Sequence, residues 1–475
     1  MQMGHSQPKG FSIFFLTEMW ERYGFYVIQT VLVFYLLQRL HLNDSQTYII
    51  VGSFTALAYI NSLFGGLIAD RFIGYDKAVT IGGVMLLIGY AILGVGKTLP
   101  PIALGLACVT AGTGMLKPNV SSMLSILYKN GDPRKDAGYT LYYVGIYVGA
   151  TSGGLLGGYL QTWFNWQASF ASSALGIVFA LAIFSYGIKK HKLTDHRHTN
   201  ISSMDILKSL ASVLVLVVIS YFVLQSQTLS LIYFALIAVF CLSFVLYHIL
   251  TSTGVVRSKL IAFLFLIFLS VLYWAIYFQQ FFSIGLATQR TVQLSVPESA
   301  VPAIESFGVI IFGPIINYIW FKFQDMGRSV SIAAKFSFGF LYNSICFLVL
   351  AGGMYYAYKS GVYLSIWFIV VAYLLVSVGE LCLSPTSLSM VPSLVPEKLT
   401  SAMMGISLLS IGFGGKLAGF LASSAEINLT NNGMSDMKYT YMKSFFSYFI
   451  ISLLTFFVAI ALKKFITKLI EAKVE

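Results

Sequence analysis

The sequence predicts an all-α membrane protein with fourteen transmembrane helices, built as two six-helix bundles with two extra helices between them. Of its 475 residues, 57% are hydrophobic and only 10% are charged, whereas a soluble domain carries about 25% charged residues. Fourteen apolar segments reach the roughly 20 residues that a helix needs to cross a bilayer. The most polar stretch, residues 191–200, lies near the middle of the chain and is typical of a linker.

The expected helices divide into three predicted domains. The two that follow the linker, 204–225 and 228–249, carry almost no charge, and we interpret them as additions to a core of two six-helix halves. The domains are therefore residues 1–190 (N-terminal bundle), 191–256 (linker and extra helices) and 257–475 (C-terminal bundle). The predicted helices span residues 11–40, 46–69, 78–96, 101–127, 138–163, 167–188, 204–225, 228–249, 259–286, 300–322, 332–357, 362–386, 400–424 and 440–462.

The net charge of +12 would suggest nucleic acid as a partner of a soluble protein. Here half of the Lys and Arg residues fall in five short connections on one side of the expected bundle, so we expect no nucleic-acid partner. The positive-inside rule then predicts that both termini are cytoplasmic. The basic connections are residues 70–77, 128–135, 189–198, 322–328 and 463–473.

Charged residues inside the first expected helix need a physical reason. The stretch FLTEMWERYGFY contains Glu18, Glu21 and Arg22, and an ionisable group costs about 2.5–3.5 kcal/mol at the centre of a bilayer. The spacing of three or four residues places these side chains and Tyr26 on one helix face, where acid and base can neutralise each other. Such groups are usually functional. An ion pair that only joins helices is the alternative.

Four further charged residues within expected helices are considered as functional candidates. Lys117 precedes Pro118, and we expect this proline to break the fourth helix and expose backbone carbonyls to a cavity. Glu380 lies at mid-helix and is a strong candidate for binding. Glu305 and Lys416 have two open interpretations each, namely a functional group within the membrane or a solvated residue near a helix end.

Other residue types argue against an enzyme. The four cysteines fall in apolar segments without CxxC spacing, which indicates packing residues rather than a disulfide or metal site. The six histidines lie at termini, in loops or near helix ends, and no Ser–His–Asp order or phosphate-binding glycine loop is present. We therefore expect neither catalytic nor metal-binding residues, and no cofactor.

Several motifs carry a specific resemblance. Residues 18–26, EMWERYGFY, resemble the ExxERFxYY signature of the proton-coupled oligopeptide transporter family, a branch of the major facilitator superfamily. GMLKPNVSS (114–122), DAGYTLYYVGIYVGA (136–150) and GELCLSPTSLSMV (379–391) resemble motifs of its fourth, fifth and tenth core helices. Residues 65–77 resemble a loop of the superfamily, and two extra central helices are typical of bacterial members of the family.

The resemblance implies the major facilitator fold and proton-driven import of di- and tripeptides by alternating access. It implies a monomer in a bacterial inner membrane, with protons as the coupling ion. Glu21 would carry the proton with Glu18 and Arg22 as partners, Lys117 would pair with these acids and face the peptide carboxylate, and Glu380 would bind the peptide amino group. The pocket would be lined by Tyr26, Tyr59, Tyr147 and Ser407, the last two at positions where the family has asparagine and tryptophan.

The chain also departs from the family pattern. Phe278 occupies the place of an acid in the seventh core helix, and Gln29 occupies the place of its usual arginine partner. Losing both is self-consistent, because neither charge is left alone in a low dielectric. Glu305 lies where the family usually has asparagine, and we hypothesise that it takes part of the missing acid's gating or proton role.

Two further functions stay open from the sequence. One keeps the fold and changes the cargo to another small zwitterion or anion, such as an amino acid, nitrate or a drug. The other is a membrane sensor or channel that responds to pH through the charged residues.

Overall fold

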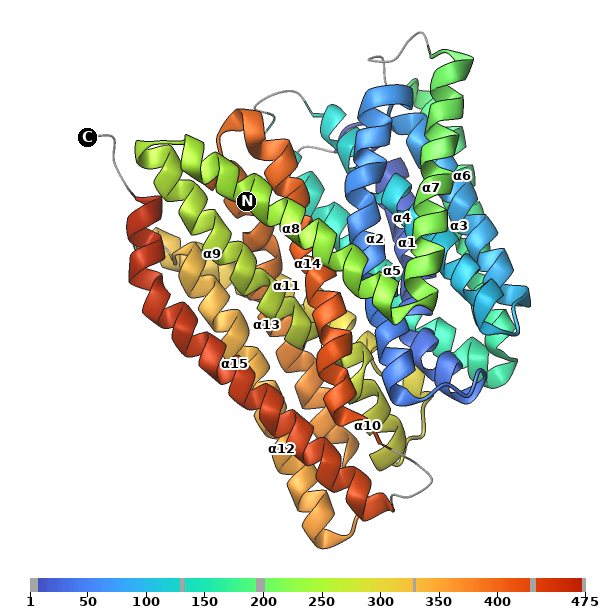
Figure 1. Cartoon of the computed structure of the whole chain (residues 1–475), viewed down its shortest axis with the longest axis vertical. Helices are drawn as coiled ribbons and strands as arrows, with labels where there is room; N and C mark the ends of the chain where they lie inside the picture. The colour runs from blue at the N-terminus through green and yellow to red at the C-terminus, as the bar shows by residue number, and fades with distance from the viewer. Residues whose placement is uncertain are drawn as a thin grey trace. The chain divides into compact units, whose positions relative to one another are not determined.

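The computed structural model describes residues 7–128, 132, 134–193, 201–327, 330–427 and 433–471, and these residues form helices without a β-strand (Figure 1). The first helices are α1 (Phe11–Gln38), α2 (Asp44–Ile68), α3 (Tyr75–Val95), α4 (Leu99–Ile126), α5 (Arg134–Trp163), α6 (Trp166–His191), α7 (Ser203–Gln225) and α8 (Gln227–Thr251). They are followed by α9 (Gly254–Tyr277), α10 (Ser283–Thr291), α11 (Ala303–Asp325), α12 (Ile332–Ser360), α13 (Ile366–Leu394), α14 (Thr400–Ala422) and α15 (Met434–Ile470).

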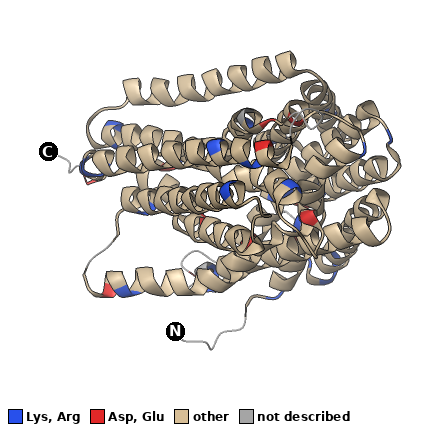
Figure 2. Ribbon diagram, turned by 90° about the horizontal axis from the view of Figure 1, so that it is seen from below, with Lys and Arg blue, Asp and Glu red and all other residues tan. Residues whose placement is uncertain are grey.

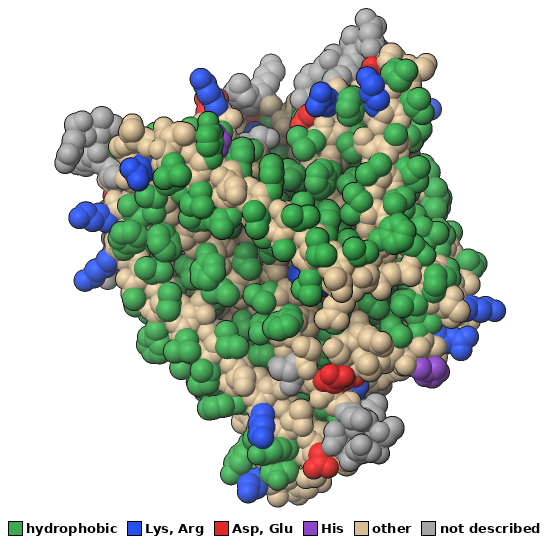
Figure 3. Space-filling model, in the orientation of Figure 1, with side chains coloured by type: hydrophobic (Ala, Val, Ile, Leu, Met, Phe, Trp, Pro, Cys, Tyr) green, Lys and Arg blue, Asp and Glu red, His purple; other side chains and the backbone are tan. Residues whose placement is uncertain are grey.

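The prediction of fourteen transmembrane helices is confirmed. Within the described residues, 12 helical segments are long and apolar enough to span a membrane. The helices α1 and α5, with 28 and 30 residues, are as long as these segments. They are less apolar because they contain charged, tyrosine and glycine residues. The short α10 continues α9 after a 3₁₀ turn, Phe278–Phe281, within one span. Hydrophobic side chains cover much of the face seen in Figure 3, as expected of a multi-pass membrane protein.

The chain forms two compact units. Unit 1 contains Met1–Leu42, Leu57–Gln227 and Ser299–Ala303, and unit 2 contains Asn43–Ala56, Thr228–Glu298 and Ile304–Glu475. Of the two predicted extra helices, α7 therefore belongs to unit 1 and α8 to unit 2. Most of the predicted linker, residues 194–200, lies outside the described residues. The three-domain division of the sequence stays a prediction.

Close contacts between α1 and α5 depend on glycine. A Cβ atom at Gly149 would lie 2.2 Å from the carbonyl oxygen of Met19, and one at Gly153 would lie 2.4 Å from that of Tyr23. No larger residue fits at these distances without a shift of the backbone, so the two helices approach closely because these positions are glycine. This contact holds α1, with its charged residues, in a fixed position within unit 1. The four cysteines are buried and free, as expected of packing residues.

The helix α4 is continuous, and the predicted break at Pro118 is wrong. The proline lies inside Leu99–Ile126, and the side chain of Asn119 donates a hydrogen bond to the carbonyl oxygen of Met115 at 2.6 Å. A Cβ at Gly114 would lie 2.6 Å from the carbonyl of Asn61, so α2 packs tightly along this turn. The backbone of α4 therefore stays helical through the proline, with α2 packed directly against the turn that precedes it.

The extra helices are held by polar contacts. In unit 2, the half-buried Lys416 donates from Nζ to Ser53 Oγ at 2.8 Å and to Ser230 Oγ, on α8, at 2.6 Å. In unit 1, Asn61 Nδ2 donates to Ser220 Oγ, on α7, at 3.1 Å. The solvated interpretation of Lys416 is therefore wrong, because its ammonium group is engaged by two buried hydroxyl groups. The ribbon in Figure 2 shows how few charged residues the helices carry.

Candidate functional site

Three charged side chains of α1 form a buried cluster in unit 1. Arg22 donates from Nη2 to Glu21 Oε1 at 2.6 Å and from Nε to Glu21 Oε2. Its Nε also lies 3.5 Å from Glu18 Oε1. The two glutamates are 0% exposed and Arg22 is 2% exposed. The acids and the base therefore neutralise each other. The i,i+4 spacing predicts the contact of Glu18 with Arg22, whereas Glu21 reaches Arg22 from the adjacent position.

Residues of α4 complete this cluster. Thr113 Oγ1 donates to Glu21 Oε1 at 3.2 Å. One turn later, Lys117 lies with Nζ 4.9 Å from the ring centroid of Tyr59 on α2, a cation–π contact. Lys117 is close enough to interact electrostatically with Glu18 and Glu21, although the described part of the chain contains no direct ion pair between them. Two acids and two bases thus make a cluster with no net formal charge. Thr113 was not identified from the sequence.

A second cluster lies in unit 2 and joins α9, α11 and α13. The hydroxyl of Tyr277 lies 3.1 Å from Glu380 Oε2 and 3.3 Å from Glu305 Oε1. Glu380 is 5% exposed and Glu305 is 1% exposed. The solvated interpretation of Glu305 is wrong, because the residues before it, 299–303, are themselves buried and α11 begins inside the protein. Tyr277 was missed, since only the fold brings the two acids to it.

The predicted pocket residues lie on four helices. Tyr26 on α1 and Tyr59 on α2 are half-buried, and Tyr147 on α5 is buried. Ser407 on α14 is buried and donates a hydrogen bond to the carbonyl oxygen of Ser387 at 3.1 Å. In each unit, then, the predicted pocket residues lie on a helix that carries part of the charged cluster or on another helix of the same unit. Their contact with a substrate stays a prediction.

The positions of the missing charge pair are filled by uncharged, buried side chains. Gln29 on α1 is 2% exposed and Phe278 is 4% exposed. The ring of Phe278 packs against that of Trp274, with centroids 5.8 Å apart. Phe278 thus belongs to an aromatic cluster at the end of α9, and neither position leaves a charge in the interior.

An ion pair in unit 2 was not predicted. Arg290, at the end of α10, donates from Nη1 and Nη2 to the two carboxylate oxygens of Asp44, both at 2.7 Å. Its Nη1 also donates to Tyr441 OH at 2.9 Å. The arginine and aspartate side chains are 7% and 3% exposed. The sequence feature that could have indicated this ion pair is an arginine in a region where basic residues are otherwise rare. This bidentate pair holds the start of α2 to α10 and α15.

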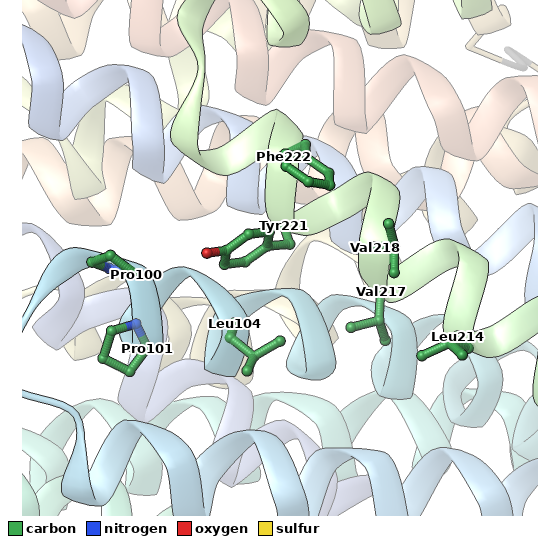
Figure 4. Close-up of a pocket in the computed structure, with 8 residues that line it drawn as sticks. All are labelled: Pro100, Pro101, Leu104, Leu214, Val217, Val218, Tyr221 and Phe222. Atoms are coloured by element: carbon green, nitrogen blue, oxygen red, sulfur yellow. The ribbon is translucent and has the colours of Figure 1, made fainter.

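An apolar groove of about 390 Å³ runs between α4 and α7 (Figure 4). Its lining is hydrophobic apart from one tyrosine hydroxyl, and it has no charged group that could bind a zwitterion. The described residues also contain no group of three or more His, Cys, Asp or Glu that could hold a metal ion. The two charged clusters are therefore the better candidates for a functional site. The groove residues are Pro100, Pro101, Leu104, Leu214, Val217, Val218, Tyr221 and Phe222.

Comparison with known proteins gives a consistent result. The model of the POT family matches residues 76–440. Dipeptide and tripeptide permease A of Erwinia pyrifoliae is 30% identical over 438 residues, which cover 90% of this chain and 88% of the relative. The permease of the same name from Escherichia coli K12 is 28% identical over 444 residues, covering 90% and 87%.

Solved structures are also similar over nearly the whole chain. A crystal structure of the peptide transporter POT in complex with sulfate has a TM-score of 0.83 and 25% identity, and the match covers 99% of this chain and 96% of that one. A crystal structure of tetrameric PepTSo2 has a TM-score of 0.86 and 24% identity, with 97% and 98% covered. Because its sequence identity is below 25%, the similarity to tetrameric PepTSo2 supports the fold alone.

Proposed function

The chain belongs to the POT family of proton-coupled oligopeptide transporters, and on that premise we propose that it imports di- and tripeptides with protons by alternating access. The predicted family and the major facilitator fold are thereby confirmed. The family consists of transporters, which agrees with the expectation that the chain is not an enzyme.

The observation that carries the proposal is the buried cluster of Glu18, Glu21 and Arg22 within a transmembrane helix. A proton on Glu21 removes the charge that binds Arg22, so the guanidinium is released for another anion. Proton binding therefore changes the stability of the contacts that α1 makes. Such a change is required if proton binding is to be coupled to a conformational change. Lys117, within electrostatic reach of both acids, responds to the same event.

A zwitterionic peptide needs a cation for its carboxylate and an anion for its amino group. Arg22 and Lys117 supply the cations and Glu380 supplies the anion. Glu305 takes part in proton coupling, because it shares Tyr277 with Glu380. The residues that line the peptide pocket in this proposal are Tyr26, Tyr59, Tyr147 and Ser407.

We place the transporter in a bacterial inner membrane as a monomer, with both termini in the cytoplasm and protons rather than a bound cofactor as the coupling partner. Bacterial permeases among its relatives support the location. Light scattering on the purified protein in detergent tests the monomer, and a fourfold mass would favour a tetramer like that of the structurally similar PepTSo2.

Transport by purified protein in liposomes tests the function. A labelled dipeptide should accumulate only when an inward proton gradient is imposed, and a protonophore should abolish accumulation. Unlabelled dipeptides and tripeptides should compete, whereas amino acids and nitrate should not. Current without peptide accumulation would indicate a channel and contradict the proposal. Failure of all peptides to compete would contradict the assigned substrate, even if the vesicles accumulate another solute.

A further inference from the structure

The apolar groove between α4 and α7 has fixed walls. Asn61 of α2 donates from Nδ2 to Thr110 Oγ1 of α4 at 3.2 Å and to Ser220 Oγ of α7 at 3.1 Å. All three residues are buried, so these hydrogen bonds tie both walls of the groove to α2. At the start of α4, the rings of Pro100 and Pro101 lock the backbone. The groove is therefore preformed, and a ligand can enter it without moving a helix.

The groove opens onto the surface of unit 1. Leu104 of α4 and Leu214 and Phe222 of α7 are exposed, and both helices are long and apolar enough to span a membrane. Exposed apolar side chains on such helices face the hydrocarbon of the bilayer. Tyr221 supplies the polar group of the lining, and Figure 4 shows its hydroxyl directed toward Pro100 at the start of α4. The occupant is therefore apolar over most of its length and polar only at one end.

The length of the groove matches one leaflet of a bilayer. Its α7 wall runs from Leu214 to Phe222, eight positions that rise about 12 Å along a helix. The hydrocarbon core is about 30 Å thick, so one leaflet contributes about 15 Å. Phe222 lies close to the end of α7 and Pro100 at the start of α4, so the groove runs from the membrane surface toward the middle. A lipid acyl chain fits this length, whereas a spanning helix of a partner would need a groove along the whole membrane.

Positive charge lies at the surface end of the groove. Lys97 is exposed and stands three residues before Pro100, in the connection between α3 and α4. Because successive spans alternate in direction, this lysine lies on the side of the membrane opposite to the basic connections 70–77 and 128–135. The exposed Thr98 is the N-cap of α4, and the first turn, Leu-Pro-Pro-Ile, contains no acid. A phosphate group at this point would meet an ammonium group, a hydroxyl group and the positive end of a helix dipole.

We propose that the groove is a binding site for one phospholipid, with an acyl chain along Leu104 and Leu214 and the phosphate beside Lys97. Tyr221 then lies between chain and phosphate, where its hydroxyl can donate to an ester oxygen of the lipid. Anionic phospholipids bind more tightly than zwitterionic ones, because they add charge that complements Lys97. The lipid covers the seam between α4 and the extra helix α7 and so stabilises their contact. With the orientation proposed above, it belongs to the outer leaflet.

Native mass spectrometry of the full chain tests the site with phosphatidylglycerol and phosphatidylcholine that carry identical chains. Leu104→Trp fills the groove, and Leu175→Trp, at an exposed position of α6, is the matched control. Lys97→Gln removes the charge, and the exposed Lys189→Gln, in a basic connection, is its control. The wild type should retain one phosphatidylglycerol more tightly than phosphatidylcholine. Leu104→Trp should weaken this binding about tenfold, as when about two methylene groups are displaced, and Lys97→Gln about fivefold, the effect of one lysine at a lipid surface.

Both controls should bind phosphatidylglycerol as the wild type does. Added phosphatidylglycerol should also raise the unfolding temperature of the wild type more than that of Leu104→Trp. Lys97 is exposed, so Lys97→Gln tests the site even if Leu104→Trp fails to fold.

Equal retention of phosphatidylglycerol by the wild type, Leu104→Trp and Lys97→Gln would overturn the inference and leave only general contact with lipid. A dimer in light scattering that Leu104→Trp converts to a monomer would also overturn it, because a second copy of the chain would then fill the groove. None of these measurements involves peptide uptake, so the lipid site and the proposed function fail separately.

Discussion

The two charged clusters neutralise their acids in different ways. In unit 1, Glu18 and Glu21 are balanced by Arg22 on the same helix, with Lys117 nearby. In unit 2, Glu305 and Glu380 meet at a tyrosine hydroxyl, and the described residues give Glu305 no cation. The first cluster contains its own counter-charges, whereas in the second a neutral tyrosine hydroxyl lies between the two acids.

This difference indicates which cluster responds to protons and which responds to a cation of the substrate. An acid paired with an arginine loses a strong partner when it binds a proton, so proton binding there changes the protein. An acid paired with another acid gains stability from any positive charge, so binding there reports the substrate. The first cluster is thus suited to coupling and the second to recognition.

The largest effect is expected on removing the base of the first cluster. Arg22→Gln leaves two fully buried glutamates without their partner, and breaking such a pair typically costs about 3–5 kcal/mol. Thermal unfolding in detergent should show a strongly destabilised protein with little transport. The control is Arg39→Gln at an exposed position near the end of the same helix. Equal stability of the two variants would show that the acids of unit 1 do not depend on Arg22.

A smaller loss is expected on disturbing the backbone that carries this cluster. Gly149→Ala places a Cβ 2.2 Å from the carbonyl of Met19, so α1 and α5 must separate, at a cost of about 1–3 kcal/mol. The control is Gly66→Ala, where a Cβ meets nothing within 4 Å and alanine should stabilise the helix by roughly 0.5–1 kcal/mol. The unfolding temperatures of the two variants should therefore move in opposite directions. A shift of the same sign would contradict the close α1–α5 contact.

The smallest effect on stability is expected in the second cluster. Glu305→Gln keeps the size of the side chain, and the amide oxygen can accept the hydrogen bond from Tyr277. We expect a change of about 1 kcal/mol or less in the free energy of unfolding. A loss as large as that of Arg22→Gln would show that Glu305 is ionised and paired, which would remove the difference between the clusters.

Much of the fold follows from hydropathy, because a span needs about 20 apolar residues whatever it packs against. The cluster around Glu18, Glu21 and Arg22 was also predictable, since all three lie on one helix and Glu18 is three and four residues from the other two. The meeting of Glu305 and Glu380 was not, because 75 residues separate them in sequence and only packing of α11 on α13 and α9 unites them. The unbroken α4 was missed for a similar reason, since the tight packing of α2 against the turn before Pro118 cannot be read from the sequence.

The transport behaviour of Glu21→Gln tests the central claim, that the cluster of unit 1 couples protons to peptide movement. Purified variant and wild type are compared in liposomes for uptake driven by a proton gradient and for exchange of labelled against unlabelled dipeptide. We predict that the variant loses gradient-driven accumulation and retains exchange. Glutamine, like a protonated Glu21, leaves Arg22 released for the peptide, but it cannot carry a proton across the membrane. Gradient-driven accumulation at the wild-type level and with the wild-type pH dependence would contradict it.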